Sequence, residues 1–288
     1  MVHDFPDQAT FLSEEERALV IRRLKEDNQA SATHEEFQMK YFWQSCKDWK
    51  QWLYMVIYMG ADCPLYAFSL FLPTISKSMP VDCCKPALIA NDAPTVADLG
   101  YKATEANLLT VPPYALAAIS TVTFGYIADR TRQRGLCNIA ASFFGIIGFC
   151  MLLGSQDSKV KYAGVFLGAM GIYPCIPNSI VWCSNNTGGV FKRGVMMGFV
   201  VGWGNLNGVV SSNIYRAKDK PKYYLGHGVV LAFLVIFLLG GSVLMRQLLV
   251  AENRKRRNGE RDHIGQGMSE EEKMHELGDQ RPDFIYTL

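Results

Sequence analysis

The sequence lacks the residue clusters on which membrane-bound catalysis depends. Only five histidines occur, and each lies in or beside a polar segment instead of within a cluster that could bind a metal. The eight cysteines show no paired metal-ligand spacing. An intramembrane aspartyl protease would need two facing carboxylates at depth, and Asp62 has no intramembrane carboxylate partner in the sequence. We therefore expect no enzyme activity, no catalytic residue, no metal site and no cofactor.

No basic stripe typical of nucleic-acid binding is present either, because charged residues crowd into the two ends of the 288-residue chain and leave an apolar middle. The segment Met1–Gln8 is polar and lacks the apolar core of a secretory signal. Ser13, followed by Glu14, Glu15 and Glu16, is typical of a helix capping box. We expect a short amphipathic helix there, within a cytoplasmic segment that covers residues 1–50.

Six apolar runs follow, each near the ~20 residues that an α-helix needs to cross a bilayer. All of them must be helical, because backbone polar groups in lipid need partners within the protein. The sequence therefore predicts an all-α membrane protein whose residues 51–250 form a six-helix transmembrane bundle. The runs cover residues 52–76, 108–128, 136–154, 160–183, 194–215 and 228–250.

The segment Gly125–Gly135 (GYIADRTRQRG) concentrates charge between two of these runs. A charged side chain at mid-bilayer costs at least ~2.5 kcal/mol, so this cluster must lie at a membrane surface. Short loops rich in Lys and Arg stay on the cytoplasmic side, which places both ends of the chain in the cytoplasm. Lys192, Arg193 and the run Arg254–Arg257 agree with this sidedness, whereas the basic residues between Arg216 and Lys222 fall on the outer side.

Glycine and proline indicate how the helices pack. Glycine pairs at four-residue spacing let helix backbones approach closely, either in a static bundle or as faces that slide during a transport cycle. Prolines interrupt the second and fourth runs, a pattern that is tolerated where a helix lines a cavity. The glycine pairs are Gly164 with Gly168, Gly198 with Gly202 and Gly204 with Gly208, and the prolines are Pro112, Pro113, Pro174 and Pro177.

Polar residues within the apolar runs indicate a transport pathway. Asp62 lies near the middle of the first run, where an ionisable group is a functional candidate; a neutral, hydrogen-bonded structural role is the alternative. Amides in the fourth and fifth runs are costly in lipid unless they face a wet cavity or one another. Amide and indole groups can donate hydrogen bonds to a carboxylate without a buried cation. The predicted substrate-binding residues are Tyr66, Asn178, Trp182, Asn186 and Asn205.

Several stretches resemble a known family. The loop with Gly125, Asp129, Arg130 and Arg134 resembles the GxxxDRxxxR loop of the major facilitator superfamily. DWKQWLYMVIYMG, PLYAFSLFLPTI, ANLLTVPPYALA, YPCIPNSIVWCSNNTGG and GNLNGVVSSNIYRAKDKPKYYLGHG resemble the fungal allantoate permease family, and this resemblance extends from Asp48 to Gly228.

The resemblance implies a plasma-membrane symporter that moves small organic anions by alternating access, with a proton as the coupling ion. Family members transport allantoate, nicotinate, pantothenate, biotin or dipeptides, and the sequence does not select among them. Asp62 is then the candidate proton carrier. The resemblance makes Gly125, Asp129, Arg130 and Arg134 a gating loop, in which Asp129 accepts hydrogen bonds from arginines and from the N-terminus of the fifth run.

The resemblance also defines two departures. Family members have two six-helix halves, and this chain corresponds to the second half of a twelve-helix fold, with a start similar to the central cytoplasmic loop. Residues 80–98 form an insertion that is either an extracellular loop containing Cys83 and Cys84 or a translated intron. The alternative to an active transporter is a truncated half-transporter without independent activity. Residues 251–288 are expected to form a disordered cytoplasmic tail.

Overall fold

The computed structural model describes residues 11–26, 39–77, 110–155, 157–214, 224–269, 272–273 and 276–288. Within these ranges every regular element is helical, as predicted. The insertion at 80–98 and the basic residues between Arg216 and Lys222 lie outside the described residues. The elements are α1 (Glu14–Glu26), α2 (Met39–Lys47), α3 (Trp49–Lys77), α5 (Val111–Thr131), α6 (Arg134–Gly154), α7 (Ser158–Ile172), α8 (Cys175–Asn185), α9 (Val190–Asn205), α10 (Asn207–Ile214), α11 (Tyr224–Ala232), the π-helical η5 (Phe233–Gly240), α12 (Gly241–Arg257) and the 3₁₀ turn η6 (Gly278–Gln280).

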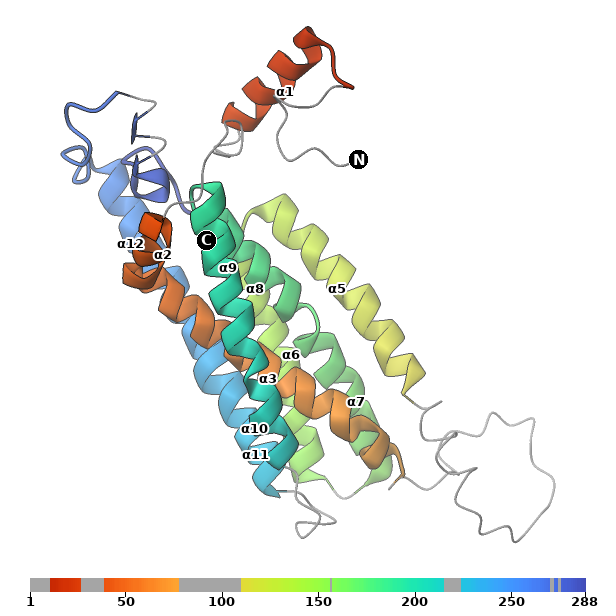
Figure 1. Cartoon of the computed structure of the whole chain (residues 1–288). Helices are drawn as coiled ribbons and strands as arrows, with labels where there is room; N and C mark the ends of the chain where they lie inside the picture. Colours follow the sequence, from red (N-terminus) through yellow and green to blue (C-terminus); the bar gives the residue numbers. More distant parts are fainter. Residues whose placement is uncertain are drawn as a thin grey trace, which may run out of the picture.

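Helix α1 begins with the capping box that the sequence predicts. The Ser13 hydroxyl accepts a hydrogen bond from the Glu16 backbone N–H (3.3 Å), and the Glu16 carboxylate accepts one from the Ser13 backbone N–H (3.0 Å). In Figure 1, α1 lies beyond one end of the bundle that the later helices form. The prediction of a capped helix at this position is confirmed.

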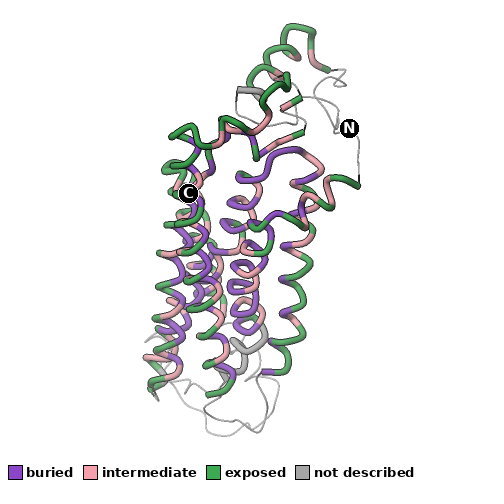
Figure 2. Tube along the Cα trace, turned by 90° about the vertical axis from the view of Figure 1, so that its left-hand side faces the viewer, coloured by how far each residue is buried: buried purple, intermediate pink, exposed green. Residues whose placement is uncertain are grey.

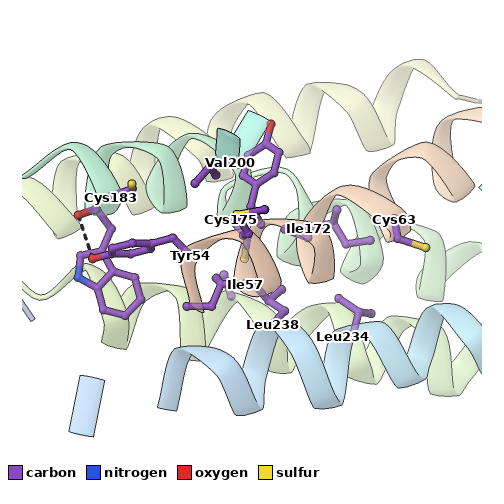
Figure 3. Packing of buried hydrophobic residues seen from close by; sticks show 14 of the residues in the cluster. Tyr54, Ile57, Cys63, Ile172, Cys175, Cys183, Val200, Leu234 and Leu238 are labelled. Atoms are coloured by element: carbon purple, nitrogen blue, oxygen red, sulfur yellow. Dashed lines mark hydrogen bonds between the residues drawn. The ribbon is translucent and has the colours of Figure 1, made fainter. Parts of the chain in front are cut away.

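Helix α3 lies at the centre of the bundle, beside η5, α8, α9, α10 and α12. It has neighbours on several sides, and its residues Tyr54, Ile57 and Ala61 are at most 1% exposed. Figure 3 shows labelled side chains of α3 converging with those of α7, α8, α9 and η5. The outward faces of the helices carry the exposed residues, as Figure 2 shows. An apolar core therefore holds α3 in place while the outer faces remain apolar enough for lipid.

Within the described part of the chain, four segments are long and apolar enough to cross a membrane. Helix α3 and the α9–α10 pair occupy the other two predicted runs and lie in the same bundle (Figure 1). The six predicted runs thus match helical segments to within a few residues, except that α12 continues to Arg257. Crossing by all six segments stays a prediction. The four segments are Val111–Thr131, Arg134–Gly154, Lys159–Asn185 and Tyr224–Arg257.

Prolines act differently in the two runs where they occur. Pro174 separates α7 from α8, which agrees with the predicted interruption. Pro112 and Pro113 instead stand in the first turn of α5, after Thr110 at the N-cap. Proline is favoured at this place because the first N–H groups of a helix have no intrahelical partner to lose. The prediction that these two prolines break the second run was therefore wrong, since they begin the helix.

The glycine pairs also divide into two kinds. A Cβ atom on Gly148 of α6 would lie 2.4 Å from the backbone N of Gly168 in α7, so these backbones touch, as the Gly164–Gly168 pair predicts. Gly204 lies against the ring of Tyr58. Added Cβ atoms on Gly198 and Gly202 of α9, and on Gly208 of α10, would meet nothing within 4 Å. This second set does not pack helices together within the described residues and instead lines an open face.

One end of the bundle collects the charged loops, and we call it the charged end. It holds the turn between α5 and α6, the start of α9 and the end of α12 (Figure 1). Arg132 caps α5 in the left-handed conformation (φ 54°) and reverses the chain into α6. The predicted cytoplasmic basic residues near 130–134, 192–193 and 254–257 are thus at the same end. Which membrane side this end faces stays a prediction.

The last residues of the chain differ from the predicted disordered tail. Residues 251–257 belong to α12, and residues 276–288, which we call the strap, fold back onto the charged end. Phe284 and Tyr286 of the strap are buried. The tail was expected to be disordered because its composition is polar; the structure instead pairs its charges and backbone groups with partners distant in sequence.

Candidate functional site

The first polar site lies halfway along α3, where it meets α9 and α10. Asp62 is 3% exposed, and its Oδ2 atom has no hydrogen-bond partner among the described residues. A Cβ on Gly204 would lie 2.3 Å from the Tyr58 ring and 3.5 Å from Asp62 Oδ2, so the absence of a side chain at Gly204 makes room for both. The predicted ionisable group at mid-helix is therefore buried and incompletely paired.

Tyr66, Asn205 and Asn207 complete this site. Together with Asp62 they form a set of four residues that we call the mid-bundle cluster. The Tyr66 hydroxyl donates to Asn205 Oδ1 (2.7 Å). The Asn207 amide donates to the Met59 carbonyl (3.3 Å), while its Oδ1 is buried without a partner in the described part of the chain. Tyr66 is half-buried and Asn205 exposed, so the cluster reaches the bundle surface. Two unpaired oxygens can accept hydrogen bonds from a proton-bearing group or a ligand.

Three of the five predicted substrate residues lie elsewhere, at the charged end. Asn178 of α8 accepts a hydrogen bond from Arg134 Nη1 (3.0 Å) and donates to Asn138 Oδ1 (2.8 Å) and to the Arg134 carbonyl (2.8 Å). Asn138 in turn donates to Ser179 Oγ (2.9 Å). Arg134 also forms an ion pair with Asp129. We call these five residues the gate network, and in it Asn178 joins α8 to the first turn of α6.

The gating loop makes one of the two contacts that were expected of it. Asp129 pairs with Arg134, as predicted for an arginine, but no hydrogen bond joins it to the N-terminus of α9 within the described residues. The Asp129 side chain is 69% exposed, whereas that of Arg134 is buried. Arg130 is exposed in the last turn of α5, and a Cβ on Gly125 would meet nothing within 4 Å. The structure thus places the ion pair between α5 and α6.

Trp182 and Asn186 contact the strap. The Trp182 indole N–H donates to the Thr287 carbonyl (2.9 Å). Asn186 donates to the same carbonyl (2.9 Å) and to the Tyr54 hydroxyl (2.7 Å), and its Oδ1 accepts the Thr287 backbone N–H (2.7 Å). Figure 3 marks the neighbouring bond from the Tyr54 hydroxyl to the Trp182 carbonyl (3.2 Å). The polar groups of Trp182 and Asn186 are therefore satisfied by the chain itself.

A buried ion cluster, missed by the sequence analysis, holds the strap beside these residues. Asp279 accepts hydrogen bonds from Lys50 and from Lys192 Nζ (2.8 Å), and Lys192 also pairs with Asp48 (2.9 Å). Arg256 donates to the carbonyl of Asp279 (3.0 Å). The only sequence signal was that Asp48, Lys50 and Lys192 border apolar runs. Nothing local in the sequence joins them to a residue near position 280.

The ionisation of Asp279 follows from these neighbours. Burial raises the pKa of its carboxyl group, but the positive charges of Lys50 and Lys192 outweigh burial and lower the pKa to about 2. The carboxylate is therefore charged throughout the physiological pH range. A buried charge of this kind is tolerated only because its oxygens are fully paired.

The chain is similar to fungal membrane transporters over nearly its whole length. The high-affinity nicotinic acid transporter of Saccharomyces cerevisiae is 32% identical over 282 residues, which cover 97% of this chain and 48% of that protein. An uncharacterized transporter of Schizosaccharomyces pombe is 31% identical over 285 residues, with 99% and 53% covered. The major facilitator-type transporter hxnP of Emericella nidulans is 27% identical over 290 residues, with 99% and 54% covered.

The chain thus spans about half the length of the curated relatives it matches. No family profile and no solved structure matches it. The relatives are named as transporters and not as enzymes. The chain is therefore similar to membrane transporters, one of them named as major facilitator-type, and its apolar helices agree with a membrane setting. The narrower resemblance to allantoate permeases stays a prediction.

Proposed function

We propose that this chain is a six-helix half of a major facilitator transporter that moves small organic anions across the plasma membrane with proton coupling. The relatives support the class, and the name of the Saccharomyces cerevisiae relative supports a carboxylate such as nicotinate as the first substrate to test. In this proposal the charged end faces the cytoplasm, because its loops carry the excess of basic residues.

The buried Asp62 carboxylate with its unpaired oxygen is the observation that carries the proposal. An ionisable residue at the middle of a membrane helix is costly unless it has a function. Tyr66 and Asn205 lie in the same cluster. The Asn205 amide has a second N–H besides the one that bonds the Val201 carbonyl, and the Tyr66 hydroxyl can turn from Asn205 to an anion. We assign substrate contact to these two residues and proton transfer to Asp62. A carboxyl group at this site can take up and release a proton as hydration of the cluster changes.

Asn178, Trp182 and Asn186 have a different role in this proposal. Their hydrogen bonds go to Arg134 and to the strap, so they hold the charged end closed instead of touching substrate. Arg134 also pairs with Asp129, and the gate network therefore ties the ends of α5, α6 and α8 together. Breaking this network would open the charged end during a transport cycle.

An alternative function is that of a half that transports only when paired with a second six-helix unit. The open face of α9 and α10, with Gly198, Gly202 and Gly208, favours this alternative because small residues normally receive another helix. The relatives, about twice as long as this chain, support it as well. Asn205 of the mid-bundle cluster lies on the same stretch, so the second unit would complete the site.

Uptake of radiolabelled nicotinate into membrane vesicles that contain the chain tests the proposal. We expect proton-stimulated uptake, and we expect Asp62→Asn to lower it at least tenfold at equal membrane content. Asp62→Glu, which keeps the ionisable group, is the matched control. Uptake that survives Asp62→Asn would refute the proton role. Uptake that appears only after co-expression with the other half of a relative would establish the paired alternative.

A further inference from the structure

The strap is bound as a peptide is bound by a receptor. Side chains and one backbone group of three helices hydrogen-bond to the backbone of three consecutive strap residues. Asn253 of α12 exchanges two hydrogen bonds with Tyr286 (both 2.9 Å). Asn186, the C-cap residue of α8, exchanges two with Thr287, and the Gly135 backbone N–H of α6 donates to the carbonyl oxygen of Leu288 (3.1 Å).

The side chains of the strap fit a complementary seat. Tyr286 lies between two cations, with Lys50 Nζ 4.4 Å and Arg256 Cζ 4.3 Å from its ring centre. Its hydroxyl accepts a hydrogen bond from Arg256 Nη2 (2.8 Å). Phe284 packs edge-on against this ring at 5.2 Å. The seat therefore selects an aromatic residue at this position through charge as well as shape.

Glycine makes the close approach possible on the receptor side. A Cβ on Gly188, between α8 and α9, would lie 2.3 Å from the Asp279 backbone N. The Gly188 N–H also donates to Asp279 Oδ1 (3.3 Å). Gly278 in the strap has φ +53°, a left-handed conformation that favours glycine. Glycine on each side, Gly188 in the receptor and Gly278 in the strap, thus allows the two backbones to approach at this contact.

We propose that the charged end contains a binding site for the strap peptide and that the strap occupies this site reversibly. Buried ion pairs fix where a segment binds more than how tightly, because desolvation offsets much of the Coulomb attraction. Ordering the strap also costs conformational entropy, which opposes docking. Binding is therefore specific and of moderate strength.

Release of the strap would act directly on the gate network. Gly135, which binds Leu288, follows Arg134, and Arg134 holds Asp129 and Asn178. Release would also leave the Trp182 indole and the Asn186 amide without their strap partners and open to water. Strap occupancy thus favours the closed arrangement of the charged end. This inference concerns a peptide site and holds whether or not the chain transports nicotinate.

Peptide binding in detergent micelles tests the inference. The receptor is the chain ending at residue 275, and the fluorescent probe is the peptide ELGDQRPDFIYTL (residues 276–288). We expect saturable binding, at least tenfold weaker binding of the Asp279→Asn peptide, and unchanged binding of the Ile285→Ala peptide, because Ile285 is exposed. Absent binding to a folded receptor, or equal binding of the wild-type and Asp279→Asn peptides, would overturn the site.

A measurement on the full chain covers the case in which the shortened chain fails to fold. The backbone N–H groups of Tyr286 and Thr287 donate to Asn253 Oδ1 (2.9 Å) and to Asn186 Oδ1 (2.7 Å), so a docked strap protects them. Hydrogen–deuterium exchange of these two amides, followed by mass spectrometry, reports release of the strap. We expect slow exchange in the wild-type chain, at least tenfold faster exchange in Asp279→Asn, and the wild-type rate in Ile285→Ala. Exchange of these amides only on unfolding of the whole bundle would show a permanent contact and refute reversibility.

Discussion

The mid-bundle cluster and the charged end each contain a buried carboxyl group, Asp62 and Asp279, but the oxygens of these two groups are paired to different degrees. At the charged end, both oxygens of Asp279 accept hydrogen bonds from cations or from backbone N–H groups. In the mid-bundle cluster, Asp62 Oδ2 and Asn207 Oδ1 have no partner among the described residues. An unpaired buried polar atom costs stability, so its retention points to a function outside folding.

This difference in pairing predicts that one group of residues contributes to stability and the other to transport. A fully paired carboxylate such as Asp279 fixes the position of the elements that pair with it, and its loss should appear in the free energy of unfolding. An incompletely paired cluster contributes little to that free energy, and its loss should appear in transport. Substitutions at Asp279 and Asp62 therefore test the comparison directly. Substitutions at glycines that are packed against a neighbouring helix, or that lie on the open face of α9, make the same test for helix packing.

The largest effect on stability is expected at Asp279. The substitution Asp279→Asn leaves Lys50 and Lys192 with Asp48 as their remaining carboxylate partner, and breaking a buried ion pair costs about 3–5 kcal/mol. Chemical denaturation in detergent micelles measures the change. The matched control is Glu276→Gln. Glu276 lies in the same strap and forms an exposed ion pair with Lys40 of α2, and the loss of this pair should cost less than about 1 kcal/mol. Equal effects of both variants would contradict the buried role.

Acid titration provides a second measurement of the same contribution. The pKa of Asp279 is about 2 in the folded chain, below its value of about 4 in an unfolded chain. A lowered folded pKa adds stability that is complete above pH 4 and is lost as the pH falls from about 4 to 2. We therefore expect docking of the strap, measured as binding of the fluorescent 276–288 peptide, to be constant between pH 5 and 8. A transition within that range would point to a different group.

An intermediate effect is expected from glycine substitutions. A Cβ on Gly171 of α7 would lie 2.2 Å from the backbone N of Gly145 in α6, so Gly171→Ala must push two helices apart. Overpacking of this kind costs about 1–3 kcal/mol. Gly198→Ala on the open face of α9 is the matched control and should leave the unfolding free energy unchanged or slightly raised. Destabilisation by Gly198→Ala would show that this face is packed.

The elements of the bundle could be predicted from sequence because each depends on local information. The apolar runs predicted the helices of the bundle, and the Ser13–Glu16 pattern predicted the start of α1. Four of the predicted runs correspond to segments that are apolar enough to cross a membrane. Proline was less informative, since its effect depends on where a helix begins: Pro174 separates two helices, whereas Pro112 begins one.

The charged end could not be predicted because its contacts join distant parts of the chain. Asp279 is 229 residues from Lys50 and 87 from Lys192, and no local pattern links them. Asn178 was predicted to bind substrate because amides are costly in lipid, yet Arg134 and Asn138 satisfy it. A polar side chain in an apolar run shows that a partner exists, but only the fold shows whether that partner is a ligand or the protein.

The smallest effect on stability is expected at Asp62, and it decides how the comparison is interpreted. Asp62→Asn removes a buried ionisable group whose Oδ2 has no partner to lose, so we expect a change in unfolding free energy within about 1 kcal/mol, of either sign. The same variant should lose uptake at least tenfold. A destabilisation as large as that of Asp279→Asn would mean that Asp62 holds the bundle together and would remove it as the proton carrier. An Asp62→Asn variant that stays stable but loses uptake would instead place the transport function in the mid-bundle cluster, where two buried oxygens have no hydrogen-bond partner among the described residues.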